Sequence, residues 1–419
     1  MSASSTPDRP PRLAGADWLR RPQTQAVFAA LAAKGHAARA VGGAVRNVLL
    51  GRPVVDVDIA TPARPEDVIA AAEAAGLSAV PTGIAHGTVT VIADGVPYEI
   101  TTLRRDVETH GRHATVAFTD DWAADAGRRD FTINALYCSA DGELFDPLGG
   151  AGDIEARRVR FIGEPRERIR EDYLRILRFF RLSAEYAQGP PDAAALSACV
   201  LEREGLARLS AERVRQELLR LLVAPRGPEL VRWMLYYGLL PSVLVSAPRP
   251  TLLERLAVLE TALAVTPDAM LRLAALAVEV PEDADRLANR LRLANDERAR
   301  LAQMAMHTPD VSPSAPEAAA RAYLYAAGAP AYRDRVLTTW ARSTASVDSQ
   351  SWRTRLALAE RWQPPRMPVG GADVMALGVP AGPRVGELLR ALESWWIAGD
   401  FAADEVSLRD RLQKLASRS

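Results

Sequence analysis

Strand-forming patterns occur only in the N-terminal part of the chain, and this division limits the possible folds more than any other feature. Apolar runs at 37–41 and 54–60 predict two strands. Two alternating stretches with Asp-Gly turns, 87–103 and 137–145, predict hairpins. From Ile154 onward the apolar residues follow helical spacing. The expected fold class is therefore α+β, with a mixed sheet first and an all-α remainder.

The composition indicates an ordinary globular protein whose positive charge is almost entirely arginine. The 419 residues are 48% hydrophobic, carry no net charge, and include only two lysines, Lys34 and Lys414. A chain of this length is expected to form about two to four domains. Arginine offers a planar fork suited to phosphates and bases, although a GC-rich genome would give the same bias. The position of particular arginines must therefore carry any functional argument.

Cysteines and the N-terminus exclude several classes of protein. Cys138 and Cys199 are far apart and lack metal-site spacing, so both are expected to be reduced and buried. The polar stretch 1–11 contains no apolar signal core, and no apolar run approaches the roughly 18 residues of a membrane span. We therefore expect a soluble, cytoplasmic protein.

Two glycines and two aspartates form the first candidate site. Gly42-Gly43 ends an apolar run and opens a helix-like segment, and Asp56 and Asp58 follow in the next apolar run. On a strand, residues i and i+2 project from the same face, so the two carboxylates would converge on one point suited to Mg²⁺. A glycine turn beside them could offer backbone N–H groups to phosphate. This pattern predicts phosphoryl or nucleotidyl transfer.

Two further features follow along the chain. Glu99, on the second arm of the first hairpin, is either a third metal carboxylate or an exposed strand residue. The polar, aperiodic stretch 104–114 is interpreted as a mobile loop next to the site. It contains His110 and His113. We interpret them as polar loop residues and not as metal ligands, because no other Cys/His cluster lies near them in the sequence.

Arginine and aspartate recur in two later segments. Arg128, Arg129 and Asp130 precede the apolar run Phe131–Leu136, where they could cap a helix or hold a sugar and phosphates. The stretch 165–181 is interpreted as one long helix. On that helix Asp172, Arg175, Arg178 and Arg181 would be neighbours at steps of three, as a polar row or as a solvated charged face.

These motifs, in this order, resemble those of class II tRNA nucleotidyltransferases, the family that also contains bacterial poly(A) polymerases. The motifs are Gly-Gly-x-Val-Arg, Asp-x-Asp, Arg-Arg-Asp-Phe-Thr-Ile-Asn-Ala-Leu and Glu-Asp-x-Leu-Arg-x-x-Arg. The resemblance covers 38–225 strongly, and the segment from Gly371 also resembles the C-terminal part of CCA-adding members. It implies a polymerase-beta-like nucleotidyltransferase head followed by helical parts. The implied divisions are a disordered N-terminus at 1–13, a catalytic head at 14–150, a base-recognising neck at 151–225, a body at 226–345 and a tRNA-binding tail at 346–419.

The resemblance also implies roles for individual residues. It assigns Asp56 and Asp58 to catalysis with two Mg²⁺ ions, one at the RNA 3′-hydroxyl and one at the triphosphate. The triphosphate positions are matched by Gly43 and Arg46, and Gly42 is a further nucleotide-binding position. The ribose motif is matched by Arg128, Arg129 and Asp130, with Asn134 a further nucleotide-binding position. The implied partners are CTP, ATP, and the 3′ end and elbow of tRNA, with no membrane and no stable protein partner.

Base choice then follows from hydrogen-bond chemistry. Asp172 can only accept and Arg175 only donate, which matches the amino group and ring nitrogen shared by cytosine and adenine. Uracil and guanine present the reverse pattern and would leave both side chains mispaired. Arg178 and Arg181 would support the phosphates or this base-reading pair.

The sequence departs from the family pattern at Asn47, where the motif usually ends in Asp, and a structural role is expected there. No His-Asp metal-hydrolase signature occurs. The main expectation is template-independent addition of CCA to tRNA. The alternatives are a poly(A) polymerase, an enzyme adding only A or only CC, and a catalytically silent RNA-binding protein.

Overall fold

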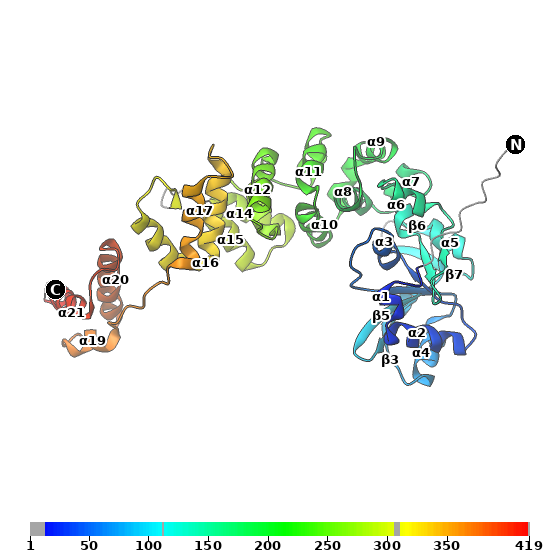
Figure 1. The fold of residues 1–419 in the computed structure, drawn as a ribbon, viewed down its shortest axis with the longest axis horizontal. Coiled ribbons are helices and arrows are strands. Elements are labelled where there is room, and N and C mark those ends of the chain that lie inside the picture. The colour runs from blue at the N-terminus through cyan, green and yellow to red at the C-terminus, as the bar shows by residue number, and fades with distance from the viewer. Residues whose placement is uncertain (1–12, 111–112, 306–310, 418–419) are drawn as a thin grey trace. The chain divides into compact units, whose positions relative to one another are not determined.

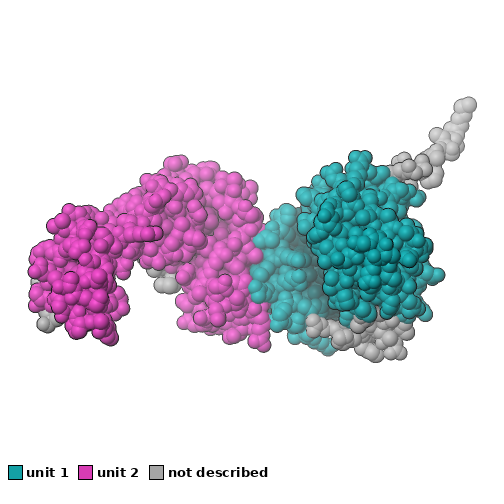
Figure 2. All heavy atoms as spheres, turned by 90° about the horizontal axis from the view of Figure 1, so that it is seen from below, with its two compact units in different colours: residues 1–243 teal, residues 244–419 magenta. Residues whose placement is uncertain are grey.

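The structure, a computed structural model, describes residues 13–110, 113–305 and 311–417 (Figure 1). The chain divides into two compact units, residues 1–243 and 244–419, which Figure 2 shows in two colours. Of the segment 1–13, which was expected to be disordered, all but the buried Leu13 lies outside the described residues.

A mixed seven-stranded sheet forms the N-terminal part of the first unit, as expected. β2 pairs with β5 in parallel, and the other neighbours are antiparallel. In spatial order the strands are β3 (Ser78–Gly83), β4 (Thr88–Ala93), β5 (Val96–Thr102), β2 (Asp58–Thr61), β1 (Arg39–Val41), β8 (Tyr137–Ser139) and β9 (Leu144–Phe145). Both predicted hairpins, β4–β5 and β8–β9, are confirmed.

The two faces of the sheet differ because side chains alternate along each strand. On β5, Tyr98 and Ile100 are buried, and the Tyr98 hydroxyl shares a hydrogen bond with Thr24 of helix α2 (Pro22–Ala33). Helices α2 and α4 (Pro65–Ala74) pack against this face (Figure 1). Glu99, one residue along, therefore projects from the opposite face, where it pairs in register with Asp58 of β2.

Two local expectations were wrong, and one strand was not predicted. The strand expected at 54–60 begins only at Asp58, so Asp56 lies in the loop before β2. The stretch 104–114 is an antiparallel hairpin, β6 (Arg104–His110) with β7 (His113–Phe118), and not a loop. Its polar, aperiodic sequence concealed it because strands are recognised by the alternation of apolar and polar residues. The edge strand β3 also lacked a clear signal because it is largely exposed and contains Pro81.

Helices make up the rest of the first unit. The α-helices are α1 (Asp17–Arg20), α2, α3 (Gly43–Leu49), α4, α5 (Trp122–Gly127), α6 (Gly150–Glu155), α7 (Pro165–Glu171), α8 (Leu174–Tyr186), α9 (Ala193–Leu201), α10 (Ala211–Val223) and α11 (Gly227–Tyr236). The 3-10 turns are η1 (Ile84–His86), η2 (Thr132–Asn134), η3 (Arg203–Arg208) and η4 (Leu240–Ser242). Cys138 and Cys199 are buried and form no disulfide bond, as expected.

Buried aromatic rings join the sheet region to α8. Phe131 lies 4.6 Å from Phe161 and Phe161 lies 5.8 Å from Phe179, measured between ring centroids. All three side chains are fully buried. Since Phe131 directly follows Asp130, this contact fixes the Arg-Arg-Asp segment against α8. That segment lies between α5 and η2, so it does not start a long apolar helix.

The long helix expected at 165–181 is interrupted. α7 ends at Glu171, and α8 begins at Leu174. Between them Asp172 has an extended backbone (φ −154°, ψ 105°), and its carboxylate accepts a hydrogen bond from Leu174 N. Aspartate favours such capping positions over helix interiors because it competes for backbone donors. The polar row therefore continues along α8 from Arg175, with Asp172 placed in the break before it.

The second unit is helical throughout its described part. Its helices are α12 (Pro250–Ala262), α13 (Ala269–Ala277), α14 (Pro281–Leu291), α15 (Asn295–Ala305), α16 (Glu317–Arg342), α17 (Gln350–Leu356), α18 (Leu358–Arg361), α19 (Gly371–Ala376), α20 (Pro383–Ala398) and α21 (Glu405–Ala416). α16 is broken at Gly328 (φ 80°), two residues before Pro330. Within the described residues, no helix is both long and apolar enough to cross a membrane.

Candidate active site

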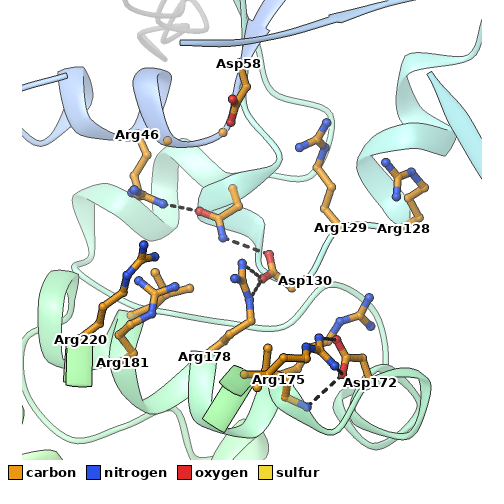
Figure 3. Close-up of a pocket in the computed structure, with 16 residues that line it drawn as sticks. Arg46, Asp58, Arg128, Arg129, Asp130, Asp172, Arg175, Arg178, Arg181 and Arg220 are labelled. Atoms are coloured by element: carbon orange, nitrogen blue, oxygen red, sulfur yellow. Dashed lines mark hydrogen bonds and ion pairs between the residues drawn. The ribbon is translucent and has the colours of Figure 1, made fainter. Parts of the chain in front are cut away.

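One cavity of about 590 Å³ in the first unit gathers nearly all the predicted site residues (Figure 3). Every predicted nucleotide-binding residue lines it, together with Asp58. Four lining residues were not predicted: Leu174, Leu182, Arg213 and Arg220. The lining predicted from sequence consists of Gly42, Gly43, Arg46, Asp58, Arg128, Arg129, Asp130, Asn134, Asp172, Arg175, Arg178 and Arg181. Asp56 and Glu99 lie outside this lining.

The glycine turn brings backbone to the cavity wall at the start of α3. Gly42 has φ +69°, a conformation that L side chains rarely adopt. A Cβ there would also lie 3.4 Å from the carbonyl oxygen of Asn134. Gly43 then begins α3, whose first N–H groups have no partner within the helix. The Gly42 N–H donates to the Leu136 carbonyl (3.0 Å), so the N–H groups left for an anion are those at the start of α3.

A chain of hydrogen bonds joins α3 to α8 across the cavity (Figure 3). Arg46 Nη1 donates to Asn134 Oδ1 (2.5 Å), and Asn134 Nδ2 donates to Asp130 Oδ1 (3.0 Å). Asp130 Oδ2 accepts from Arg178 Nε (2.7 Å). Burial alone would raise the pKa of Asp130, but Arg178 and Asn134 hold it below its usual value. Asp130 is therefore a fixed anion, and the chain holds four predicted residues in one arrangement.

Asn47, where the sequence departs from the family motif, stabilises the position of Arg46 at the cavity. Its Oδ1 accepts from Arg46 Nη2 (3.1 Å), and its Nδ2 donates to the carbonyl of Pro53 (3.0 Å). The side chain thus steadies Arg46 and the loop that leads to Asp56.

Asp125 of α5 holds the two arginines that precede Asp130. It is 1% exposed and accepts hydrogen bonds from Arg128 Nε (3.0 Å), Arg129 Nη2 (2.9 Å) and the Tyr137 hydroxyl (2.8 Å). Burial opposes its ionisation, yet Arg129 and Arg128 lower the pKa of Asp125. Sequence reasoning missed this residue, although its spacing of three and four residues from the arginines on a helical segment was an available signal.

Asp58 lines the cavity, and the carboxylates of Asp56 and Glu99 act on it from outside the lining. Solvent reaches Asp58, yet crowding protein atoms desolvate it, and this together with repulsion from Glu99 raises its pKa. Asp56 raises that pKa further, whereas Arg129 opposes the effect. Two neighbouring carboxylates thus act on Asp58. Among the described residues, however, no three metal-ligating groups are close enough to form a complete metal cluster.

The base-reading pair expected from sequence is present but engaged differently. Both carboxylate oxygens of Asp172 accept from Arg213 of α10, at 3.1 and 2.7 Å. Arg175 Nη1 donates to Glu171 Oε2 at 2.5 Å, the neighbour pair expected of a charged helix face. The described contacts of Arg175 use only Nη1, which leaves Nε and Nη2 for another partner.

Helix α10 supplies two of the lining residues that were not predicted, Arg213 and Arg220. Arg213, Glu217 and Arg220 follow one another at spacings of four and three, so they share one face. Glu217 is 3% exposed and accepts from Arg181 Nε. The charged residues at these spacings, on an amphipathic helix whose apolar face is buried, were the signal that could have revealed them.

Comparison with known proteins places this cavity in a family. Residues 38–160 match the model of the poly A polymerase head domain. The mouse (Mus musculus) CCA tRNA nucleotidyltransferase 1, mitochondrial, is 32% identical over 412 residues, covering 94% of this chain and 93% of the relative. The chain belongs to the CCA tRNA nucleotidyltransferase family. It is therefore an RNA nucleotidyltransferase, an enzyme class that depends on divalent metal ions.

Two other comparisons agree with this family. The zebrafish (Danio rerio) CCA tRNA nucleotidyltransferase 1, mitochondrial, is 35% identical over 387 residues, covering 90% of this chain and 87% of the relative. The Bacillus stearothermophilus CCA-adding enzyme, solved in complex with CTP, superposes with a TM-score of 0.72 at 28% identity. That match covers 94% of this chain and 97% of the solved chain. The similarity to this CCA-adding enzyme thus extends over both units.

The cavity of this family member has an uneven charge balance. Most lining arginines face a carboxylate, through the pairs described above. Arg46 donates to Asn134, Asn47 and Tyr186, which are neutral, and burial lowers its pKa. Arg220 is exposed and has no hydrogen bond or ion pair with any described residue. The side of the cavity with Arg46 and Arg220 is thus the place where an anion from outside would be best compensated.

Proposed function

We propose that this chain adds C, C and A in turn to the 3′ end of tRNA, using CTP and ATP and releasing pyrophosphate. The observation that carries the proposal is that Asp58 lines the same cavity as Asp172 and Arg175, the two side chains that could form hydrogen bonds with a base. The CTP complex of the bacterial relative supports it, as do relatives that are named for CCA addition.

The group of carboxylates formed by Asp56, Asp58 and Glu99 is suited to binding a divalent cation. Its donors are all carboxylate oxygens, and the mutual repulsion that raises the pKa of Asp58 would be relieved by a cation. We propose that Asp56 and Asp58 hold two Mg²⁺ ions, with Glu99 beside them as a third carboxylate that either binds or stays exposed. Substrate phosphates would complete the coordination, which explains why the protein groups alone form no complete cluster. Bound Mg²⁺ would supply charge neutralisation at the triphosphate and favour deprotonation of the attacking 3′-hydroxyl.

The remaining residues would place the nucleotide. The backbone N–H of Gly43, which follows the turn at Gly42, would bind the triphosphate together with Arg46. Arg128, Arg129 and Asp130 would hold the ribose, and Asp130 has the fixed negative charge needed to accept from a hydroxyl. All these groups are held by protein contacts before substrate arrives, so little reorganisation would accompany binding.

The base would be selected between Asp172 and Arg175. Oδ1 of Asp172 accepts from both Arg213 and Leu174 N, but Oδ2 accepts only from Arg213, so it keeps a lone pair for an exocyclic amino group. The free Nε and Nη2 donors of Arg175 can meet a ring nitrogen. Cytosine and adenine satisfy both side chains, whereas uracil and guanine leave them mispaired. Arg178 and Arg181 would support this pair through their contacts with Asp130 and Glu217.

We also propose a division of the chain into four functional parts. We propose a catalytic head at 14–150, a neck at 151–225, a helical body at 226–345 and a tail at 346–419 that reads the tRNA elbow. The expected cytoplasmic location also stays a proposal, because the mouse and zebrafish relatives are named as mitochondrial proteins.

Poly(A) synthesis is the second candidate, because the head matches a model named for poly A polymerase. Product length separates the two. With tRNA lacking its last three nucleotides, Mg²⁺, CTP and ATP, we expect growth by three nucleotides and then arrest. Long A tails would favour the second candidate, and no growth would favour a silent RNA-binding protein.

Arg220 is expected to contact a substrate phosphate. In Figure 3 its guanidinium lies on the same side of the cavity as those of Arg46 and Arg181. Arg220→Gln should raise KM for CTP and ATP about threefold to tenfold with little change in kcat, because a charged hydrogen bond to the triphosphate is lost. Steady-state kinetics would measure this, with Arg215→Gln on the same helix but outside the lining as the control. An increase in the KM for tRNA alone would assign the contact to RNA instead, and no change in either KM would contradict it.

A further inference from the structure

Arg168 of α7 connects the two parts of the cavity that would read sugar and base. Its side chain is 11% exposed and lies outside the cavity lining. Nη2 donates to the backbone carbonyl of Arg129 (2.6 Å) and also to that of Arg128. Nη1 donates to the Glu171 carboxylate at 2.7 Å. One guanidinium thus binds the Arg128-Arg129 backbone and the end of α7 simultaneously.

The same side chain is coupled to Arg175 by two routes. Arg175 Nη1 donates to Glu171 Oε2, the carboxylate that Arg168 also binds, at 2.5 Å. The same Nη1 donates to the backbone carbonyl of Arg168 at 2.8 Å. A continuous series of hydrogen bonds therefore runs from the backbone of Arg128 and Arg129 through Arg168 and Glu171 to Arg175.

We propose that Arg168 is a positioning residue that sets the distance between the ribose-binding arginines and the base-reading Arg175. The inference rests on the proposed function, in which base and ribose of one nucleotide are read together. Because a nucleoside has a fixed separation between its sugar and its base edge, both readers must be held at a matching separation. Arg168 touches the backbone of one reader and the charged partner of the other, so a shift in it would misplace both.

Only arginine has the geometry for this task. Its planar fork sends Nη1 and Nη2 toward separate acceptors at once, whereas the ammonium of lysine is a single point. Loss of the fork would leave two backbone carbonyls and part of a carboxylate without their donor in a largely buried setting. Lysine would keep the positive charge but not the shared geometry, so it separates positioning from simple electrostatics.

The test compares Arg168→Lys and Arg168→Gln with Arg166→Gln. Arg166 lies on the same helix, is 44% exposed, and pairs with Glu202 away from the cavity lining. We would measure kcat/KM for CTP, UTP and dCTP on tRNA lacking CCA, the binding affinities of the three nucleotides, and thermal melting. In both Arg168 variants the CTP/UTP and CTP/dCTP ratios should each fall about tenfold, which corresponds to the loss of one charged hydrogen bond. Arg166→Gln should leave both ratios unchanged.

Several outcomes would overturn the proposal. Uniform loss of activity with both ratios preserved would give Arg168 a purely structural role. A fall in only one ratio would contradict the coupling between base and sugar reading. If Arg168→Gln melts early, Arg168→Lys decides the question. If the unaltered chain binds CTP but adds nothing to tRNA, the proposed function fails, and the binding ratios still decide the role of Arg168.

Discussion

Asp58→Asn is expected to abolish nucleotide incorporation, with a loss in kcat on the order of 10³-fold or more. Asparagine keeps the size of the side chain but removes the charge that would hold Mg²⁺ at the end of the cavity. Since the repulsion from Glu99 also disappears, the substitution should not destabilise the sheet. Single-turnover addition of CTP to tRNA lacking CCA would measure the loss, and filter binding would show that tRNA is still bound.

Two further variants test the same assignment. Asp56→Asn should cause a comparable loss, although Asp56 lies in the loop before β2 and outside the cavity lining. Asp67→Asn, on the exposed first turn of α4, removes a carboxylate far from the chemistry and should retain activity. Substantial turnover by Asp58→Asn would show that Asp58 does not bind the catalytic metal ion.

Asp172→Ala should reduce the preference for CTP and ATP over UTP and GTP, on the order of 10²-fold. The carboxylate is the only acceptor of the proposed base-reading pair, so its removal eliminates the mispairing that rejects uracil and guanine. Competition experiments with all four nucleotides on one tRNA would measure the preference directly.

Arg213 provides an independent check of the same idea. Arg213→Gln leaves Asp172 in place but removes the two hydrogen bonds that orient it, so selectivity should fall by a smaller factor. Arg215→Gln on the same helix is the matched control because it does not line the cavity. Unchanged selectivity in Asp172→Ala would show that another part of the cavity reads the base.

Local patterns predicted most of the fold and the composition of the cavity. The hairpins were visible because Asp94-Gly95 adopts the positive φ angles of a tight turn, 49° and 79°. Gly42 and Gly43, with Arg128, Arg129 and Asp130, were recognisable as a set because their residue types match phosphate and sugar. The structure places all five around one cavity.

Interactions between distant segments could not be predicted in this way. The helix break at Asp172 has no proline or glycine to mark it, and it depends on a carboxylate that binds both Leu174 N and Arg213. Asp125 was predictable only in part: its spacing from Arg128 and Arg129 was a local signal, whereas the hydrogen bond from Tyr137 of β8 was not. In both cases folding brings a distant partner to a charged side chain.

The most direct test of this account uses three tRNA substrates that end before the first C, after the first C, and after the second C. Each is incubated with one nucleotide at a time, and the extended RNA is resolved at single-nucleotide length. We predict C on the first two substrates, A on the third, and negligible U or G on any of them. Addition of A to all three, or equal use of all four nucleotides, would contradict base selection within the Asp172 and Arg175 cavity.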